Sequence, residues 1–141
     1  MAYEKDYQNW HELKKAIDQV DFPLPFKERE IWWMSLGVNI GVEIDGKGEL
    51  LEQPALIIKK YNRDHAWIVP LTSSEIKPIE GVHIPIYHSA MGDKSVAVIS
   101  QSQSISSKRL TYSICLLPPD QFIKILEAIK EALPKYTRDL V

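Results

Sequence analysis

The chain has 141 residues, of which 45% are hydrophobic and 26% are charged, and its formal net charge is −2. This length can bury a core without disulfides or metal ions, and the composition is that of an ordinary globular protein. The near-neutral charge excludes a generally basic surface, so any contact with nucleic acid has to come from a local group of residues. No apolar run approaches the roughly 18 residues of a membrane span, and we expect a cytoplasmic protein with no membrane segment.

The first predicted element is an amphipathic helix over residues 6–20. Apolar side chains recur every three or four residues along one face, at Tyr7, Trp10, Leu13, Ile17 and Val20. Asp6 suits the N-cap position, and Pro23 begins an extended connection. We expect this helix to pack on the rest of the fold through Trp10.

The middle of the chain predicts short β-strands rich in apolar and β-branched residues. They are expected at residues 31–34, 54–61, 66–71, 82–87, 95–100 and 110–117. A long loop with four glycines separates the first two, and long loops inside compact domains are often functional. Several short strands at this spacing predict a small barrel or a strongly curved antiparallel sheet.

The last predicted element is a second amphipathic helix, which begins after Pro119 and ends at Pro134. Asp120 is its predicted N-cap. The predicted apolar face consists of Phe122, Leu126, Ile129 and Leu133, with Ile125 and Ala132 alongside. The expected architecture is therefore one α+β domain over residues 1–141. Its parts are an accessory helix in residues 1–22, a barrel in 26–117 and a C-terminal helix in 119–134.

Few residues have an obvious chemical role by themselves. His83 and His88 could act as acid or base near neutral pH. The favoured interpretation is that both are polar residues that flank an edge strand and have no catalytic role. Cys115 lies in an apolar run and is expected to pack as a small hydrophobic side chain. Of the adjacent Trp32 and Trp33, at most one can face a groove, because successive strand residues point to opposite sides. No pair of His or acidic residues has a recognised metal spacing, so neither a metal nor a cofactor is expected.

Three stretches of sequence form an ordered series. Residues 29–58 contain a Trp-rich strand, the glycine-punctuated loop and a polar-Pro strand start; residues 68–74 read IVPLTSS; residues 95–110 read SVAVISQSQSISSKRL. This series resembles the PemK/MazF family of toxins from bacterial toxin–antitoxin pairs. The resemblance spans roughly residues 26–133 and implies an SH3-like antiparallel β-barrel of the CcdB/MazF type, extended here by an N-terminal helix.

The resemblance also implies a function. Members of this family are toxins of type II toxin–antitoxin systems and cleave single-stranded mRNA without a metal, using the 2′-hydroxyl of the RNA as nucleophile. It implies a homodimer and a cognate antitoxin protein that covers the RNA groove. The matching catalytic positions are Gln53, Thr72 and Ser73, and the matching RNA-binding positions are Glu43, Glu52, Gln101, Gln103 and Arg109.

Three positions depart from the family pattern. Gln53 stands in place of the catalytic Arg, Gln103 in place of a second basic residue, and Ser106 in place of an Asp. A charge-assisted hydrogen bond is about twice as strong as a neutral one. The departures therefore imply either much reduced activity or that other groups have taken over the role of the missing charges. The expectation is that Gln53 and Gln103 face one phosphate. Two alternatives remain open: a non-catalytic member that binds nucleic acid or antitoxin, and a CcdB-like toxin that targets a protein.

Glu52 raises a separate geometric question, because it directly precedes Gln53. Adjacent strand residues face opposite sides of a sheet. Both side chains can therefore reach one site only if the start of the strand is irregular.

Overall fold

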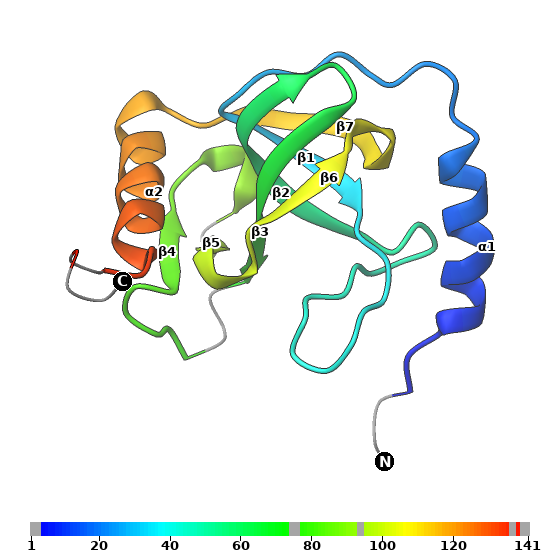
Figure 1. The fold of residues 1–141 in the computed structure, drawn as a ribbon, viewed down its shortest axis with the longest axis horizontal. Helices are drawn as coiled ribbons and strands as arrows, with labels where there is room; N and C mark the ends of the chain where they lie inside the picture. Colours follow the sequence, from blue (N-terminus) through cyan, green and yellow to red (C-terminus); the bar gives the residue numbers. More distant parts are fainter. Residues whose placement is uncertain (1–3, 74–76, 93–94, 136–137, 139–141) are drawn as a thin grey trace.

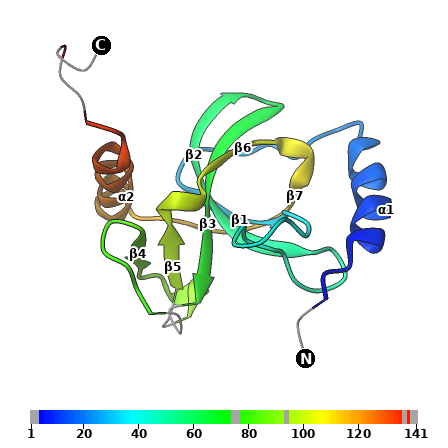
Figure 2. The same cartoon turned by 60° about the horizontal axis from the view of Figure 1, so that its bottom comes forward.

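The computed structural model describes residues 4–73, 77–92, 95–135 and 138. Helices α1 (Tyr7–Asp18) and α2 (Pro119–Ala132) flank a strongly bent antiparallel sheet on opposite sides (Figures 1 and 2). The predicted α+β fold class, with an added N-terminal helix and a C-terminal helix, is confirmed. No helix in the described ranges is long and apolar enough to cross a membrane.

The strands form one sheet with the order β4-β5-β3-β2-β1-β7, and β6 also pairs with β3. Their bounds are β1 (Glu30–Ser35), β2 (Glu52–Asn62), β3 (His65–Ser73), β4 (His83–Ile86), β5 (Ser95–Val98), β6 (Gln103–Ser106) and β7 (Leu110–Leu116). The first half of β3 pairs with β6 and its last three residues pair with β5, so β3 belongs to two parts of the sheet. The barrel-type fold is thus confirmed, although the sheet is not closed.

The strand predicted over residues 95–100 ends earlier in the structure. After Val98 the chain makes a 3-10 turn at Ile99–Gln101 and then forms β6, which the sequence analysis did not predict. Strand β6 contains mostly polar residues and buries only Ile105. Its backbone pairing with β3, rather than an apolar pattern, holds it in the sheet.

Alternating side chains of the central strands build two clusters of buried residues. The first consists of Phe26, Trp32, Met34, Leu36, Ala55, Ile57, Ala66, Ile68, Ile105 and Leu110. The second includes Ile31, Leu56, Val69 and Leu71 together with Ile125 of α2. Neighbours such as Ile31 and Trp32 fall in different clusters because the side-chain period of a strand is two.

Helix α1 forms a third, smaller cluster. Trp10 is buried against Val38 and Leu51, and Leu13 and Ile17 lie beside it. The side chain of Asp6 caps the helix by accepting a hydrogen bond from the Asn9 amide at 3.0 Å. The predicted cap and the predicted packing through Trp10 are therefore confirmed. In Figure 1, α1 stands beside the loop that connects β1 to β2.

Helix α2 differs from its prediction in two details. Its N-cap residue is Pro118, so the prediction of Asp120 as N-cap is wrong, and Asp120 lies in the first turn instead. A carboxylate there still interacts favourably with the positive end of the helix dipole. Ile125 is the buried residue of the helix, and Phe122 and Ile129 of the predicted face pack beside it against the second cluster. Leu126 and Leu133, which were predicted on the same face, are 39% and 60% exposed. The helix packs on β4 and the 3-10 turn after β5.

Candidate functional site

A pocket of about 580 Å³ opens where β2 begins and β3 ends, and we call it the strand-end pocket. Because β2 and β3 are antiparallel, these two ends lie side by side. The pocket is lined by Trp33, Lys47, Gly48, Glu52, Gln53, Pro54, Leu71, Thr72, Ser73, Ala90, Met91, Ser95, Tyr112 and Ile114. A neighbouring pocket of about 460 Å³ shares Lys47, Gln53 and Thr72 with it.

The three residues predicted to be catalytic all line this pocket. Thr72 is half-buried at the end of β3, Ser73 follows it and is exposed, and Gln53 lies across from them on β2. A hydroxyl at a strand end can donate a hydrogen bond to a phosphate oxygen. The fold therefore brings together side chains that are about twenty residues apart in the sequence.

The side chain of Gln53 is already engaged. It is 7% exposed, and its Nε2 donates a hydrogen bond to the carbonyl oxygen of Leu71. A neutral amide held in this way carries no charge that could offset a developing phosphorane. At this position the amide therefore offers less electrostatic stabilisation of the transition state than a charged guanidinium would.

Glu52 also lines the strand-end pocket, so the question of the irregular strand start is resolved. Leu51 adopts a left-handed backbone with φ of 47°, and the backbone of Glu52 forms a bridge with Lys47. The amide of each residue in this bridge donates to the carbonyl of the other, at 2.8 and 2.7 Å. One carboxylate oxygen of Glu52, Oε1, is buried and has no hydrogen-bond partner among the described residues. A buried acceptor without a partner is uncommon in folded proteins, and this observation marks Glu52 as an unusual group of the pocket.

Lys47 is the residue that the sequence analysis missed. Among the described residues that line the strand-end pocket it is the one cation, and it lines the neighbouring pocket too. Gly46 and Gly48 flank it, and a Cβ at Gly46 would overlap the carbonyl oxygen of Leu51. The two flanking glycines are the sequence feature that could have indicated Lys47, because glycine lets the backbone turn tightly on either side of the lysine.

Two aromatic rings form one wall of the strand-end pocket. Trp33 and Tyr112 have ring centroids 6.1 Å apart with a 37° tilt. Trp33 is half-buried and Tyr112 is 53% exposed. Trp32 packs in the core instead, which confirms that only one of the adjacent tryptophans faces a groove.

Three of the predicted RNA-binding residues lie elsewhere. Glu43, Gln101 and Gln103 line a separate pocket of about 360 Å³. Both amide atoms of Gln101 bind the β1–β2 loop, since Oε1 accepts from the Ile44 amide at 3.1 Å and Nε2 donates to the Val42 carbonyl at 2.9 Å. Gln103 does not line either pocket that contains Gln53, so the expectation that both glutamines face one phosphate does not hold for the described pockets.

Arg109 lines none of the described pockets and contacts other parts of the fold. Its Nη1 donates to the Ser35 carbonyl at 3.1 Å, and its Cζ lies 5.6 Å from the ring centroid of Trp10. Burial lowers the pKa of the Arg109 guanidinium below its ordinary value. These contacts assign Arg109 to the junction between α1 and the sheet.

The histidines and the cysteine also have local structural roles. The Nδ1 atoms of His83 and His88 accept hydrogen bonds from the amides of Ile79 and Ala90, at 2.8 and 3.0 Å. Cys115 is half-buried beside the second core cluster, and burial raises the pKa of its thiol. Within the described ranges, no group of three or more His, Cys, Asp or Glu residues could hold a metal ion.

Comparison with known proteins gives a consistent picture. A structure of MazF from Deinococcus radiodurans has a TM-score of 0.63 and 18% identity, covering 77% of this chain and 96% of that one. Mycobacterium tuberculosis toxin MazF-mt6 has a TM-score of 0.57 and 19% identity, covering 74% and 95%. A mycobacterial endoribonuclease in complex with its cognate antitoxin has a TM-score of 0.58 and 17% identity, covering 80% and 100%. At these identities the structures show a shared fold.

A search of curated protein sequences found no match. A family model described as "PemK-like, MazF-like toxin of type II toxin-antitoxin system" matches residues 27–133, which is most of the chain. The matched residues contain the whole sheet, α2 and every residue of the strand-end pocket, and they exclude α1. The chain therefore belongs to the PemK-like, MazF-like family of toxins from type II toxin–antitoxin systems.

Proposed function

We propose that this chain is the toxin of a type II toxin–antitoxin pair and a slow, metal-independent endoribonuclease that cleaves single-stranded mRNA. The observation that carries the proposal is the convergence of Lys47, Glu52, Thr72 and Ser73 on one pocket. These residues supply a cation, a carboxylate and two hydroxyls, which are the groups that cleavage by an internal nucleophile requires. A similar structure named as an endoribonuclease supports the assignment of the reaction class.

The chemistry assigns a role to each group. The 2′-oxygen of the RNA forms a bond to the adjacent phosphorus while the bond from phosphorus to the 5′-oxygen breaks. The departing 5′-oxygen takes a proton from water, which leaves a cyclic phosphate and a 5′-hydroxyl. Glu52 removes the proton of the 2′-hydroxyl, because it is the carboxylate among the described residues that line the strand-end pocket. The Thr72 hydroxyl donates to a phosphate oxygen and Lys47 offsets its charge. Trp33 and Tyr112 offer a surface on which a base can stack.

The expected rate is low because of Gln53. Its amide donates to the Leu71 carbonyl, and no arginine lies among the described residues of the strand-end pocket. Removing one donor from an oxyanion-type site lowers the rate by roughly 10²- to 10³-fold. We therefore expect cleavage that is measurable but much slower than that of a relative with an arginine here.

The test is a cleavage assay of the purified protein on mixed single-stranded RNA, with and without a chelator. We expect slow cleavage that persists with the chelator and falls by roughly 10²-fold or more in Thr72→Ala. Ser113→Ala is the matched control, since Ser113 is an exposed hydroxyl on β7 outside the described pockets. Equal losses in both variants, or cleavage that requires a metal ion, would contradict the proposal.

A second candidate is a non-catalytic member of the family that binds nucleic acid or antitoxin. The observation that favours it is that Gln53 and Arg109 both donate to backbone carbonyls of the fold. In that case the wild-type protein should bind single-stranded RNA and leave it intact. The same assay, combined with a filter-binding measurement, separates the two functions.

We also propose that the protein is a cytoplasmic homodimer that binds a cognate antitoxin. Strand β7 ends the described strand order of the sheet, and Tyr112 and Leu116 on it are 53% and 50% exposed. An edge strand with apolar side chains is a ready site for pairing with a second chain. Light scattering at micromolar concentration should give a mass near twice 16.2 kDa. A mass of one chain under these conditions would rule out the dimer.

A further inference from the structure

The N-terminal segment lies outside residues 27–133, which the family model matches, yet it makes extensive contact with the loop between β1 and β2. We call residues 36–51 the β1–β2 loop. Figure 1 shows α1 standing beside this loop, with the N-terminal end of the helix directed to the same end of the molecule as the loop tip. The loop carries Lys47 into the strand-end pocket.

Lys5 holds the tip of the loop. Its Nζ donates hydrogen bonds to the carbonyl oxygens of Asn39 at 2.6 Å and Gly41 at 3.3 Å. It also forms an ion pair with Asp45, whose Oδ2 lies at 3.2 Å. The side chains of Lys5 and Asp45 are only 16% and 18% exposed, so this pair is much better shielded from water than a surface pair. The hydroxyl of Tyr7 adds a hydrogen bond to the Asn39 carbonyl at 2.9 Å.

Trp10 holds the two ends of the loop. It packs against Val38 near the start and Leu51 at the end. Gly37 has a φ of 80°, and a Cβ at this position would overlap the Trp10 ring. Residues 5 and 10 thus contact the β1–β2 loop at its tip and at both of its ends.

Asp45 links these contacts to the site. It lines the pocket that Lys47, Gln53 and Thr72 also line. Its carboxylate accepts from the Asn39 amide at 2.6 Å, so the loop needs this carboxylate for its shape. Without Lys5, the same carboxylate would be a negative charge beside the place where a phosphate binds, and it would repel the phosphate.

We propose that Lys5 is a positioning residue for RNA binding. It keeps the β1–β2 loop ordered so that Lys47 reaches an RNA phosphate, and it offsets the charge of Asp45 at the same pocket. The part that concerns RNA rests on the proposed function. Ordering the loop before RNA arrives lowers the entropic cost of binding. The N-terminal segment therefore contributes to RNA affinity without touching the reacting atoms.

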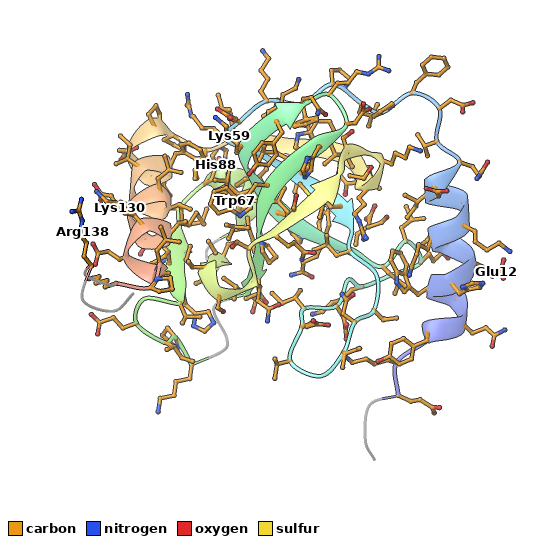
Figure 3. All side chains as sticks on the ribbon, in the orientation of Figure 1. Glu12, Lys59, Trp67, His88, Lys130 and Arg138 are labelled. Carbon is orange, nitrogen blue, oxygen red and sulfur yellow. The ribbon has the colours of Figure 1, made fainter. Side chains whose placement is uncertain are left out.

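The first test measures the loop itself and requires no RNA. Hydrogen exchange of the full chain should show amides of the β1–β2 loop, such as those of Asn39 and Gly46, exchanging about tenfold faster in Lys5→Met than in the wild type. Lys15→Met is the matched control, because Lys15 lies on the helix that follows Lys5 and pairs only weakly, at 3.8 Å, with Glu12. Figure 3 shows Glu12 on the side of α1 that faces away from the loop.

The second test measures RNA. We expect Lys5→Met to weaken binding of a single-stranded oligonucleotide about tenfold while kcat changes less than twofold, and Lys15→Met to change neither. Adding Asp45→Asn to Lys5→Met should recover part of the affinity, because it removes the unpaired carboxylate but does not replace the hydrogen bonds of Lys5 to the loop. In a Lys47→Met background, Lys5→Met should have a smaller effect than in the wild type, because the part that acts through Lys47 is then absent.

The outcomes are distinguishable. Unchanged loop exchange in Lys5→Met, or equal changes in Lys15→Met, would overturn the role of Lys5. An undiminished effect of Lys5→Met in the Lys47→Met background would show that Lys5 does not act through Lys47. If the wild-type protein binds no RNA, the proposed function fails and the RNA part of the inference fails with it. The exchange measurement still decides whether Lys5 holds the loop.

Discussion

Gln53→Arg is expected to raise the rate of RNA cleavage by about 10²-fold or more. Residue 53 lines both pockets that contain Thr72, so a guanidinium there would reach a phosphate that the Thr72 hydroxyl binds. The arginine side chain has to leave the Leu71 carbonyl, and the adjoining pocket of about 580 Å³ has room for it. RNA affinity should change much less, because a cation at this point stabilises the transition state more than the ground state.

Single-turnover cleavage and a separate binding titration measure this effect. Thr72→Ala added to Gln53→Arg should remove most of the gain. Gln8→Arg, on the exposed surface of α1, adds the same charge away from the site and is the matched control. If Gln53→Arg leaves the rate unchanged while a catalytically active relative cleaves the same RNA, the non-catalytic function is correct.

Removal of residues 1–22 is expected to leave a folded sheet that is less stable by a few kcal/mol. The residues of α1 belong to a cluster that is separate from the two clusters at the centre of the fold. The truncated chain keeps Phe26, which is 2% exposed and packs in the first cluster. The loss arises mainly because Val38 and Leu51 become exposed when Trp10 is removed.

Urea denaturation of the two proteins measures the difference in free energy of unfolding. Trp10→Ala in the full chain should account for much of the loss, since truncation of a buried tryptophan costs about 3–5 kcal/mol. Tyr7→Phe is the control, because it removes one exposed hydroxyl and leaves the packing of Trp10 unchanged. A truncated protein without a cooperative transition would show that α1 is integral to the fold.

The sequence by itself was sufficient for the elements whose pattern is local. The spacing of Trp10, Leu13 and Ile17 predicted α1 and its buried face, and Asp6 predicted its cap. The order of motifs predicted the family and the fold. These predictions succeed because hydrophobic periodicity and capping depend on residues within a few positions of one another.

Strand β6 and the N-cap of α2 were not predicted correctly. Strand β6 carries little apolar pattern, and its place in the sheet depends on pairing with residues 65–68 of β3. This partner is far away in the sequence, so a local pattern does not contain it. The helix α2 begins at Pro119, a residue type suited to the first helical position, and its cap is therefore Pro118 rather than Asp120.

The strand-end pocket required the tertiary structure. The sequence indicated Gln53 and Thr72 through their motifs, but only the fold brings Lys47 and Glu52 to the same pocket. It also assigns Gln103 to a different pocket. The positions of Lys47 and Glu52 depend on the left-handed backbone of Leu51 and on the loop between Gly46 and Gly48. The direction of a side chain in such irregular backbone follows from long-range contacts rather than from sequence spacing.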